Sequence, residues 1–546
     1  MRRIVMSVWV LLLSSMFASA GPAWGQTPVC QQDPTNPYVP ASAACVPGGF
    51  PFEIETGFRD PATANNFSLS PPGARSLAMG GAFLGLADDA TAAYTNPAGL
   101  TNLAVGGSEV AVEIRGAQFR SSFADRGHFN TTPELPTHVT NVGQDFEDGI
   151  HLGEAEGDTT GLSFLSYGFV FPGGLTMALY RHELGNFQSS FEAQGLFNDD
   201  NCDPPGPITG PNGEAAYRQP EGRECELFRV QPSRSRIDLE IVNWGASTAY
   251  AFDVGSASNL SLGLGISYYE GAIDRRNETF DTCRFDTFDA NEPLDPIGDD
   301  PDFPCTQSES RSRMPGGFYG PADFSLDNSF TITNEVGNDT AFGINLGFLW
   351  KFGREQRFSV GGVFREGPAF ETVQTTFVAA DRFDPAEDIK PPVAGTLTVP
   401  DVTGLGVAYR SADGKTKLSF DWNRVFYSQT LGDFTNNLGE FSDAYTLDDV
   451  DQFHFGFERI VLVVESLFVG SARFGAWIEP DHAPRYTGDP NDTDGDLLAL
   501  FGSEPDDVLH LSLGFGLVIK EDYQLDFAAN FSDVADAYSF SLVKFF

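Results

Sequence analysis

The chain has 546 residues, of which 41% are hydrophobic and 58 are glycine, and its mean hydropathy is −0.18. This composition excludes a protein built from hydrophobic membrane helices, and no stretch of about 18 apolar residues follows the N-terminal leader. The formal net charge of −43 argues against nucleic acid as a partner, because a phosphate backbone must be met by Lys and Arg side chains.

Residues 1–25 predict a secretory signal peptide. Two arginines precede an apolar core at residues 8–13, and small residues follow at Ala18 and Ala20, which is the pattern that signal peptidase cleaves. Residues 26–72 are rich in Pro, Ala, Gln and Asn and show no periodicity. They predict a flexible tail ahead of the folded part of the chain.

The six cysteines form three neighbouring couples, and none belongs to a Cys-x-x-Cys motif. An even number in an exported chain predicts disulfide bonds, and the spacing favours pairing within each couple among the 15 connectivities that six cysteines allow. The sequence therefore predicts no zinc site. The expected couples are Cys30 with Cys45, Cys202 with Cys225, and Cys283 with Cys305.

Residues 73–106 differ from the rest of the chain because they alternate poorly and are dense in glycine and alanine. The Asn96-Pro97 step would interrupt a strand. Small residues allow close backbone packing, and irregular backbone at membrane depth is tolerated only where protein encloses it. This segment is therefore predicted to fold inside the lumen formed by the residues that follow.

Residues 107–546 contain repeated stretches in which apolar residues occupy every second position. The clearest has Leu509, Leu511 and Leu513 on one face, with His510 and Ser512 on the other. This pattern is typical of a transmembrane antiparallel β-barrel, since only one face of each strand meets lipid. We expect an all-β fold with about 14 strands beginning near Glu109, Gly161, Gly174, Arg236, Asn259, Asp339, Arg357, Val402, Thr416, Asp451, Leu467, Val508, Tyr523 and Ala537.

The connections between these stretches are alternately short and long. Outer-membrane barrels have short periplasmic turns and long outer loops, so an even strand number places the tail and both termini in the periplasm. The cell outer membrane of a Gram-negative bacterium is the expected location. The acidic loops, such as residues 489–496, fit solvated surfaces, with divalent cations bridging them to lipopolysaccharide as the alternative.

Two predicted strands are irregular. The apolar phase shifts near Val242, which a β-bulge would explain, and Arg473 interrupts another strand. Polar residues at lumen-facing positions are expected to form a network that anchors the lumen segment, because buried charges need partners. These residues are Asp421, Asn423, His454, Glu458, Asp526 and Asn530.

The segment at residues 73–100 resembles the N-terminal hatch of the FadL family of outer-membrane transporters for long-chain fatty acids and other hydrophobic compounds. A second similarity lies at residues 399–410 and 417–428, which resemble a strand pair late in such barrels. The matching hatch residues are the Gly80-Gly81 hinge, Asp88-Asp89 and Asn96-Pro97-Ala98-Gly99.

This resemblance implies a 14-stranded barrel that its own N-terminal hatch plugs, with diffusive uptake of hydrophobic molecules, no energy source and no cofactor. It also implies a kink in an early strand, for which Gly185 is a candidate, although an ordinary strand end is the simpler interpretation. Asn96 and Pro97 fit a gating role and a simple plug equally well. Asp88 and Asp89 fit turn formers or hydrogen-bond partners of lumen residues better than ligand contacts.

Other functions were weighed against uptake. The seven histidines lie in no Gly-x-Ser-x-Gly or His-Glu-x-x-His motif, so no catalytic or metal residues are predicted. A binding shuttle for protein secretion keeps the same fold and is the stronger alternative. A water-filled porin is disfavoured by the hatch. A plugged barrel of this size has no need to trimerise, so a monomer is expected.

Overall fold

The computed structural model describes residues 70–103, 107–128, 149–200, 208–209, 215–216, 226–229, 232–255, 257–280, 329–378, 391–435, 445–464, 467–482, 484–487 and 507–546. All of them belong to one compact unit, Ile54–Phe546. The predicted signal peptide, nearly all of the predicted tail and the six predicted disulfide cysteines lie outside the described residues. No helix in the described ranges is long and apolar enough to cross a membrane.

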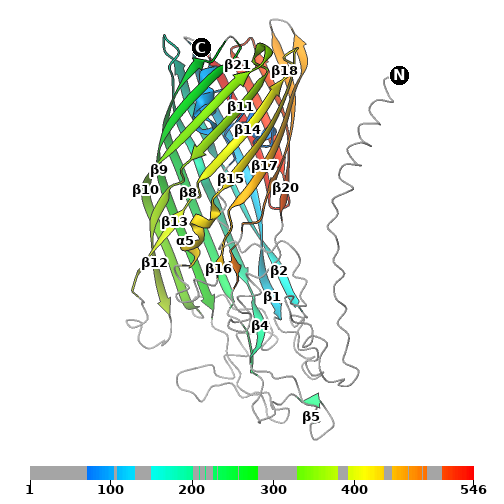
Figure 1. The fold of residues 1–546 in the computed structure, drawn as a ribbon. Helices are drawn as coiled ribbons and strands as arrows, with labels where there is room; N and C mark the ends of the chain where they lie inside the picture. The colour runs from blue at the N-terminus through cyan, green and yellow to red at the C-terminus, as the bar shows by residue number, and fades with distance from the viewer. Residues whose placement is uncertain are drawn as a thin grey trace, which may run out of the picture. The chain divides into compact units, whose positions relative to one another are not determined.

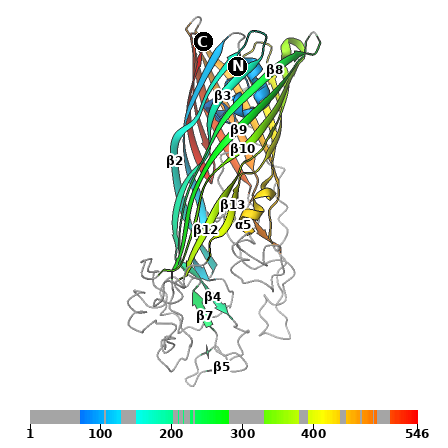
Figure 2. The ribbon, with the colours of Figure 1, turned by 90° about the vertical axis from the view of Figure 1, so that its left-hand side faces the viewer.

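The N-terminal described segment, residues 70–103, contains only short helices. These are α2 (Ala74–Ala78), α3 (Ala92–Thr95) and the 3₁₀ helix η2 (Pro97–Asn102). The views in Figures 1 and 2 both place this blue segment inside the ring of strands, near the end of the barrel that carries the C-terminus. We call residues 70–103 the hatch.

The remaining described residues are almost entirely β-strand. The wall strands of the first half are β1 (Ser108–His128), β2 (Gly149–Val170), β3 (Thr176–Ala193), β8 (Ser233–Asp253), β9 (Asn259–Phe280) and β10 (Ser329–Phe352). Those of the second half are β11 (Phe358–Arg365), β12 (Ala369–Val378), β13 (Val393–Thr398), β14 (Val402–Arg410), β15 (Thr416–Val425), β17 (Val450–Val464), β18 (Phe468–Glu479), β20 (Val508–Ile519), β21 (Tyr523–Phe531) and β22 (Ala535–Phe545).

Short elements lie between the wall strands in the sequence. Two 3₁₀ helices, a further α-helix and six short strands make up this group. They are η5 (Arg354–Gln356), η6 (Tyr427–Thr430), α5 (Leu431–Thr435), β4 (Gly195–Asp200), β5 (Ile208–Thr209), β6 (Ala215–Ala216), β7 (Glu226–Arg229), β16 (Tyr445–Thr446) and β19 (Arg485–Tyr486).

The wall closes as an antiparallel barrel of 14 strands. The sheet has 18 strands in all, of which β4 and β7 form a small extension outside the ring. In the ring, β11 and β12 together make one wall strand, and β13 and β14 together make the next. Each remaining neighbour in the sequence pairs with the next, and β1 pairs with both β2 and β22, so the last strand meets the first. The predicted all-β barrel of about 14 strands is confirmed.

Alternation explains why these residues line the wall as they do. On β9, Leu262, Leu264 and Ile266 are exposed on the outer face, while Ser261, Gly265 and Ser267 face inward. In a bilayer these exposed apolar side chains meet lipid, and the ladders of the closed wall pair its backbone groups from strand to strand. The barrel is therefore built to span a membrane.

The outer face changes character along the strands. β10 has 24 residues, so it extends about 80 Å at 3.3 Å per residue and about 60 Å along the axis at a tilt of about 40°. The apolar band needs only about 25 Å of this. On β2 the outward residues Leu162 and Tyr167 are followed, toward the long-loop end, by Asp158, Glu156 and Glu154. The strands thus project beyond the membrane.

This projection corrects two predicted boundaries. β2 begins at Gly149 and β10 at Ser329, whereas the alternation predicted starts near Gly161 and Asp339. The sequence rule looked for an apolar outer face, and the projecting part of a strand has a charged one. The segments Ala369–Val378 and Val393–Thr398, which the alternation missed entirely, also belong to this projecting part.

The irregularity near Val242 corresponds to a β-bulge in the neighbouring strand β3. Glu183 pairs with Val242 and Gly185 with Ile241, so Leu184 is the extra residue of a β-bulge in β3. Gly185 therefore lies within β3, which continues to Ala193, and the interpretation of this glycine as an ordinary strand end is wrong. Arg473, the other irregular position, points into the lumen, where it is buried.

We expect a charge on the lipid-facing band to destabilise the barrel far more than the same charge on the projecting part. Leu264 lies midway between Leu260 and Tyr268, the levels of the exposed residues Phe252 and Trp244 on β8. Leu264→Arg should lower the free energy of unfolding by about 2–4 kcal/mol. Urea unfolding from lipid vesicles measures this.

Ala272→Arg is the matched control for that substitution. It lies on the outer face of the same strand, among Glu270 and Asp274. It should change the free energy of unfolding by less than about 1 kcal/mol. Equal effects of the two substitutions would contradict the assignment of the band.

Candidate functional site

The hatch is enclosed by the wall along nearly its whole length. Its backbone turns sharply at Gly80 and Gly81, which have φ of 63° and 76°. Side chains other than glycine rarely adopt these angles. Most hatch side chains are small, and nearly all of its residues from 71 to 100 are buried. Small residues and glycine turns thus let an irregular chain pack inside the lumen.

The wall meets the hatch through glycines of its own. A Cβ atom on Gly263 would overlap the backbone of Pro97 and Ala98, one on Gly361 that of Leu84, and one on Gly475 that of Gly80. Three wall strands, β9, β11 and β18, therefore touch hatch backbone directly. This contact requires glycine at the wall positions.

Asn96 connects three parts of this assembly. Its side-chain oxygen accepts a hydrogen bond from the Ala98 N–H at 3.2 Å, which caps η2, and Pro97 occupies the first turn of that helix. Its Nδ2 donates to the carbonyls of Leu84 in the hatch and Phe348 in β10, at 3.0 and 3.1 Å. Asn96 is fully buried, so it braces the hatch against the wall.

Wall carboxylates accept hydrogen bonds from hatch N–H groups that the short helices leave free. Asp421 accepts from Leu84 N, Glu113 from Gly73 N and Glu109 from Ala90 N, each at 2.7 Å. In the reverse sense, His454 Nδ1 donates to the Gly80 carbonyl at 2.7 Å. Backbone that would otherwise be unsatisfied in the lumen is thereby paired.

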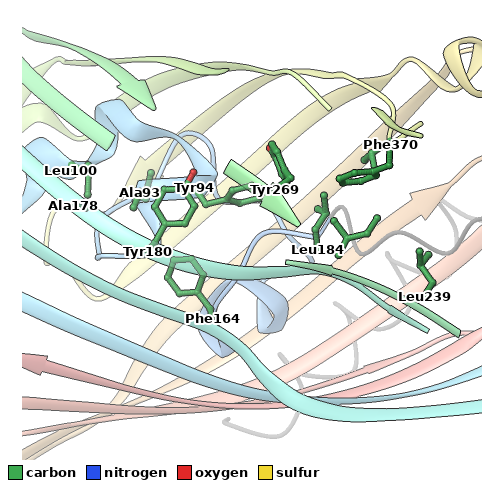
Figure 3. Packing of buried hydrophobic residues seen from close by; sticks show 14 of the residues in the cluster. Ala93, Tyr94, Leu100, Phe164, Ala178, Tyr180, Leu184, Leu239, Tyr269 and Phe370 are labelled. Carbon is green, nitrogen blue, oxygen red and sulfur yellow. The ribbon is translucent and has the colours of Figure 1, made fainter. Parts of the chain in front are cut away.

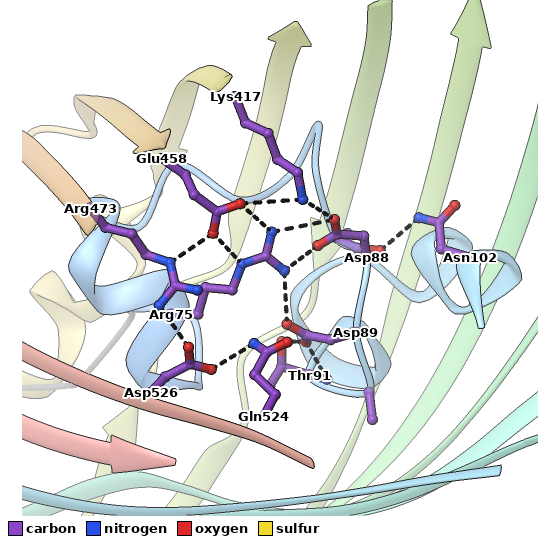
Figure 4. Close-up of polar contacts among 12 residues, drawn as sticks. Arg75, Asp88, Asp89, Thr91, Asn102, Lys417, Glu458, Arg473, Gln524 and Asp526 are labelled. Carbon is purple, nitrogen blue, oxygen red and sulfur yellow. Dashed lines mark hydrogen bonds and ion pairs between the residues drawn. The ribbon is translucent and has the colours of Figure 1, made fainter. Parts of the chain in front are cut away.

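An ion cluster joins the hatch to the second half of the wall, as Figure 4 shows. Arg75 of α2 lies 2.5 Å from Asp88, 2.9 Å from Glu458 and 3.5 Å from Asp89. We call the cluster formed by these residues and their partners the Arg75 cluster. Its further members are Lys417, 2.8 Å from Asp88, and Arg473, which bridges Glu458 at 2.7 Å and Asp526 at 2.6 Å.

The two neighbouring aspartates of the hatch differ in their electrostatics. Burial alone would raise the pKa of Asp88, but the charges of Arg75 and Lys417 outweigh it and hold this pKa well below its usual range. Burial raises the pKa of Asp89, which Arg75 offsets only in part. Burial would lower the pKa of Arg75. The charges of Asp88, Glu458 and Asp89 outweigh burial and raise this pKa above its usual value.

These shifts fix how the cluster responds to pH. A carboxyl group whose folded pKa is depressed contributes stability that is fully present above its unfolded pKa of about 3.9, and this stability is lost only as the pH falls toward the folded value. The contact of Asp88 with Arg75 and Lys417 is therefore intact at neutral and mildly acidic pH. Protonation in that range does not release it.

The sequence-predicted lumen residues are only partly brought to the hatch. Asp421, His454 and Glu458 contact it directly, while Asp526 is connected through Arg473. Asn530 instead bonds Ser512 and His510 within the wall. Asn423 Oδ1 has no hydrogen-bond partner among the described residues. The gating role expected of Gly80, Gly81, Asp88, Asp89, Asn96, Pro97 and Ala98 stays a prediction.

Sequence reasoning missed Arg75, the centre of the cluster. Between residues 73 and 87 it is the only charged side chain. A lone arginine in a segment expected to be buried would have been the signal, because a buried charge needs a partner. Its partner Glu458 lies 383 positions away in the sequence, so its identity could not be read from the local pattern.

Beyond the hatch, toward the long-loop end, apolar side chains of the wall and the hatch pack together inside the barrel. Figure 3 shows Tyr94 of the hatch with Tyr180 and Tyr269 near it, and Leu184, Phe370 and Leu239 farther along. The same cluster of buried residues includes Phe164, Phe187, Ile237, Ile241, Ile273 and Leu397. The inner face of the wall is thus apolar in this stretch, where a water-filled barrel would be polar.

Several solved structures are similar to this chain at low sequence identity. No family model and no curated protein sequence matches the chain. Among solved structures it is similar to a Pseudomonas aeruginosa FadL homologue, with 14% identity and a TM-score of 0.47 over 90% of this chain and 99% of that one.

Two further solved structures are similar to this chain. The monoaromatic hydrocarbon channel CymD has 12% identity and a TM-score of 0.45 over 88% of this chain and 99% of its own. The Ralstonia pickettii toluene transporter TbuX has 13% identity and a TM-score of 0.44 over 87% and 99%. Within the described ranges, no group of three or more His, Cys, Asp or Glu side chains is arranged to hold a metal ion.

The opposite pKa shifts of the two hatch aspartates predict unequal roles. Asp88→Asn should loosen the hatch, because Arg75 and Lys417 each lose a charged partner. We expect the leak conductance of the barrel in planar lipid bilayers to rise about tenfold, which corresponds to about 1.4 kcal/mol.

Asp89→Asn is the neighbouring control. It removes a charge that burial disfavours and that lies 3.5 Å from Arg75. It keeps an oxygen that can accept from Thr91 N. Its conductance should stay close to that of the native protein, and a leak equal to that of Asp88→Asn would contradict the assigned roles.

The glycine contacts predict a second way to displace the hatch. Gly475→Ala would place a methyl group on the backbone of Gly80, so the hatch or the wall must shift. Gly470→Ala, on the same strand, meets no atom closer than 3.4 Å. Protease cleavage of the hatch in folded, vesicle-embedded protein should become faster in the first variant by about tenfold and remain unchanged in the second. Identical cleavage rates would show that the close approach is not needed.

Proposed function

We propose that this barrel is a channel through which hydrophobic molecules, long-chain fatty acids or hydrocarbons, diffuse across the outer membrane, and that the hatch gates it. The observation that carries this proposal is the apolar lumen beyond the hatch. A polar solute gains nothing from Leu184, Leu239 and Phe370, whereas a hydrocarbon chain gains about 0.8 kcal/mol for each CH₂ group removed from water.

The length of the strands supports the same function. The polar lipopolysaccharide layer impedes apolar molecules, and the projecting part of the wall carries its apolar lining out beyond the lipid band. Residues Phe187, Ile237 and Leu397 belong to this outer stretch of the lining. A hydrophobic molecule captured there would reach the hatch without crossing the lipopolysaccharide. No energy source is required, since the ligand moves down its own gradient.

The hatch must then move for the ligand to pass, because its buried residues lie inside the wall beyond the Arg75 cluster. Three types of non-covalent contact hold the hatch in place. They are the hydrogen bonds of Asn96, the hydrogen bonds from hatch N–H groups to wall carboxylates, and the ion pairs of Arg75. Local displacement of such a segment requires breaking these contacts without unfolding the wall, whose strands pair independently of it.

Uptake by whole cells tests the proposal. Cells that carry the native protein should take up radiolabelled oleate or toluene faster than cells without it. Asn96→Ala should raise this uptake about tenfold, because two hydrogen bonds of about 0.7 kcal/mol each, which must break when the hatch moves, are then absent. Asn338→Ala, on the exposed face of β10, controls for expression and should leave uptake unchanged.

Two other outcomes have clear meanings. If neither compound enters in a protein-dependent manner, the channel proposal is wrong, and the binding shuttle for protein secretion becomes the better hypothesis. If uptake depends on the protein but is the same in Asn96→Ala, the barrel conducts and the hatch is a plug without a gating role.

A further inference from the structure

The β17–β18 hairpin reaches farther at the short-turn end than the β14–β15 hairpin beside it. The ladder between β15 and β17 ends at Arg459, and one further bond follows, from Ile460 N to the Lys415 carbonyl. β17 nevertheless continues to Val464. We call residues 460–464 the overhang, and it extends about 16 Å along the strand at 3.3 Å per residue.

The overhang is apolar on both of its faces. A bulge between Ile460 and Leu462 interrupts the alternation, so that Val463 follows Ile460 on the lumen side, where Val463 pairs with Val469. Val463 is 52% exposed, and Leu462, on the outer side, is 49% exposed. The comparable extension of β8 beyond β3, residues 250–253, carries alanine and aspartate on its lumen side instead. Lipid can cover the outer face of the overhang but not its lumen side.

The edge of the overhang that faces the β14–β15 turn is open. No strand among the described residues pairs with this edge, whereas the other edge pairs with β18, and β18 pairs with β20. An open edge presents N–H and C=O groups that can pair with another chain, above all where the strand is apolar. The protein covers a comparable edge elsewhere: along β13, Asp433 of α5 accepts a hydrogen bond from Thr398 N at 2.5 Å. The described part of the chain provides no such cover for the overhang.

Two unpaired positive charges lie next to the open edge. Arg410, at the end of β14, lines the cavity of about 570 Å³ that Ile460 also lines, and Lys415 adjoins the start of the overhang. Both are exposed. Arg410 donates to the backbone carbonyl of Glu355 at 3.2 Å. Within the described ranges, however, neither cation has a carboxylate at ion-pair distance, in contrast to Lys417. A chain laid along the open edge meets these charges, so acidic side chains would suit it.

We propose that a periplasmic protein binds here by adding an extended, acidic segment to the open edge of the overhang. Backbone hydrogen bonds extend the wall by one strand, alternate apolar side chains pack on Ile460 and Val463, and acidic side chains face Arg410 and Lys415. The short-turn end of an outer-membrane barrel faces the periplasm, where such a partner is available. This inference goes beyond the proposed channel function, because it does not depend on which molecule passes the hatch.

Peptide binding to the native full chain in phosphatidylcholine nanodiscs tests this proposal. The first probe is Glu-Glu-Val-Thr-Val-Thr-Val-Glu-Glu, which is acidic at both ends so that it can add in either strand direction. A second peptide has Lys in place of every Glu, and a third has Pro in place of both Thr residues, which removes backbone donors. Fluorescence anisotropy should show that the first peptide binds about tenfold or more tightly than each of the others.

Variants of the protein assign the binding to the overhang. Arg410→Gln combined with Lys415→Gln removes both charges and should weaken binding of the acidic peptide about tenfold. Val463→Asp places a negative charge on the lumen side of the overhang and should weaken it at least as much. Two controls make the same kinds of change elsewhere and should leave binding unchanged. They are Arg354→Gln, in the exposed turn after β10, and Ala251→Asp, on the lumen side of the β8 extension.

Several results would overturn the proposal. Equal binding of the proline peptide would exclude strand addition, equal binding of the lysine peptide would exclude the charge match, and the absence of binding by all three would exclude the site. Loss of binding in phosphatidylglycerol nanodiscs would show that anionic lipid covers the edge instead of a protein. None of these results bears on the channel proposal, which uptake by cells tests separately. Because the peptides are compared on native protein, the test stands even if a variant does not fold.

Discussion

The attachment of Arg75 to the wall is the interaction on which the rest of the lumen depends. A guanidinium buried at the centre of a barrel is tolerated only when carboxylates surround it, and Arg75 receives them from both sides: Asp88 and Asp89 from its own segment and Glu458 from β17. Those same contacts give the hatch one position relative to the wall. The glycines of the wall and the carboxylates that accept hatch N–H groups then fit only that position, so the irregular backbone is satisfied without any regular helix longer than six residues among the described hatch elements.

The two ends of the lumen are consequently different in kind. At the short-turn end, positive and negative charges are matched around Arg75 and Lys417, and an open cavity of about 570 Å³ lies beside them, lined also by Arg357 and Arg410. Beyond the hatch, toward the long loops, the inward side chains are largely apolar, and Arg365 has no ion pair among the described residues. Under the proposed function, a hydrophobic molecule would favour the second region over the first, and the hatch would be the boundary at which it stops until the ionic contacts rearrange.

The wall is also divided along its length. The part inside the lipid band obeys strict alternation, since each outward side chain meets hydrocarbon. The projecting part follows no such rule, because its outer face meets water and carries Glu154, Glu156 and Asp158, while its inner face is the apolar one. Apolar residues thus change faces between the two parts. The bulge at Leu184 lies near this change, and β11 and β14 are interrupted close to it, at residues 366–368 and 399–401.

The sequence by itself determined the barrel, its even number of strands and the special nature of the hatch, because period-two alternation and glycine density are local properties. It located Asp421, His454 and Glu458 on the lumen face for the same reason. It placed the starts of the strands Gly149–Val170 and Ser329–Phe352 too late, because the outer face of these first residues is charged and does not alternate as a lipid-facing strand does. Only the tertiary structure decided what those side chains meet. Arg75 and Glu458 are 383 positions apart, and Arg365 is 271 positions from Tyr94. Whether a buried charge finds a partner depends on how the closed wall brings such distant strands around the hatch.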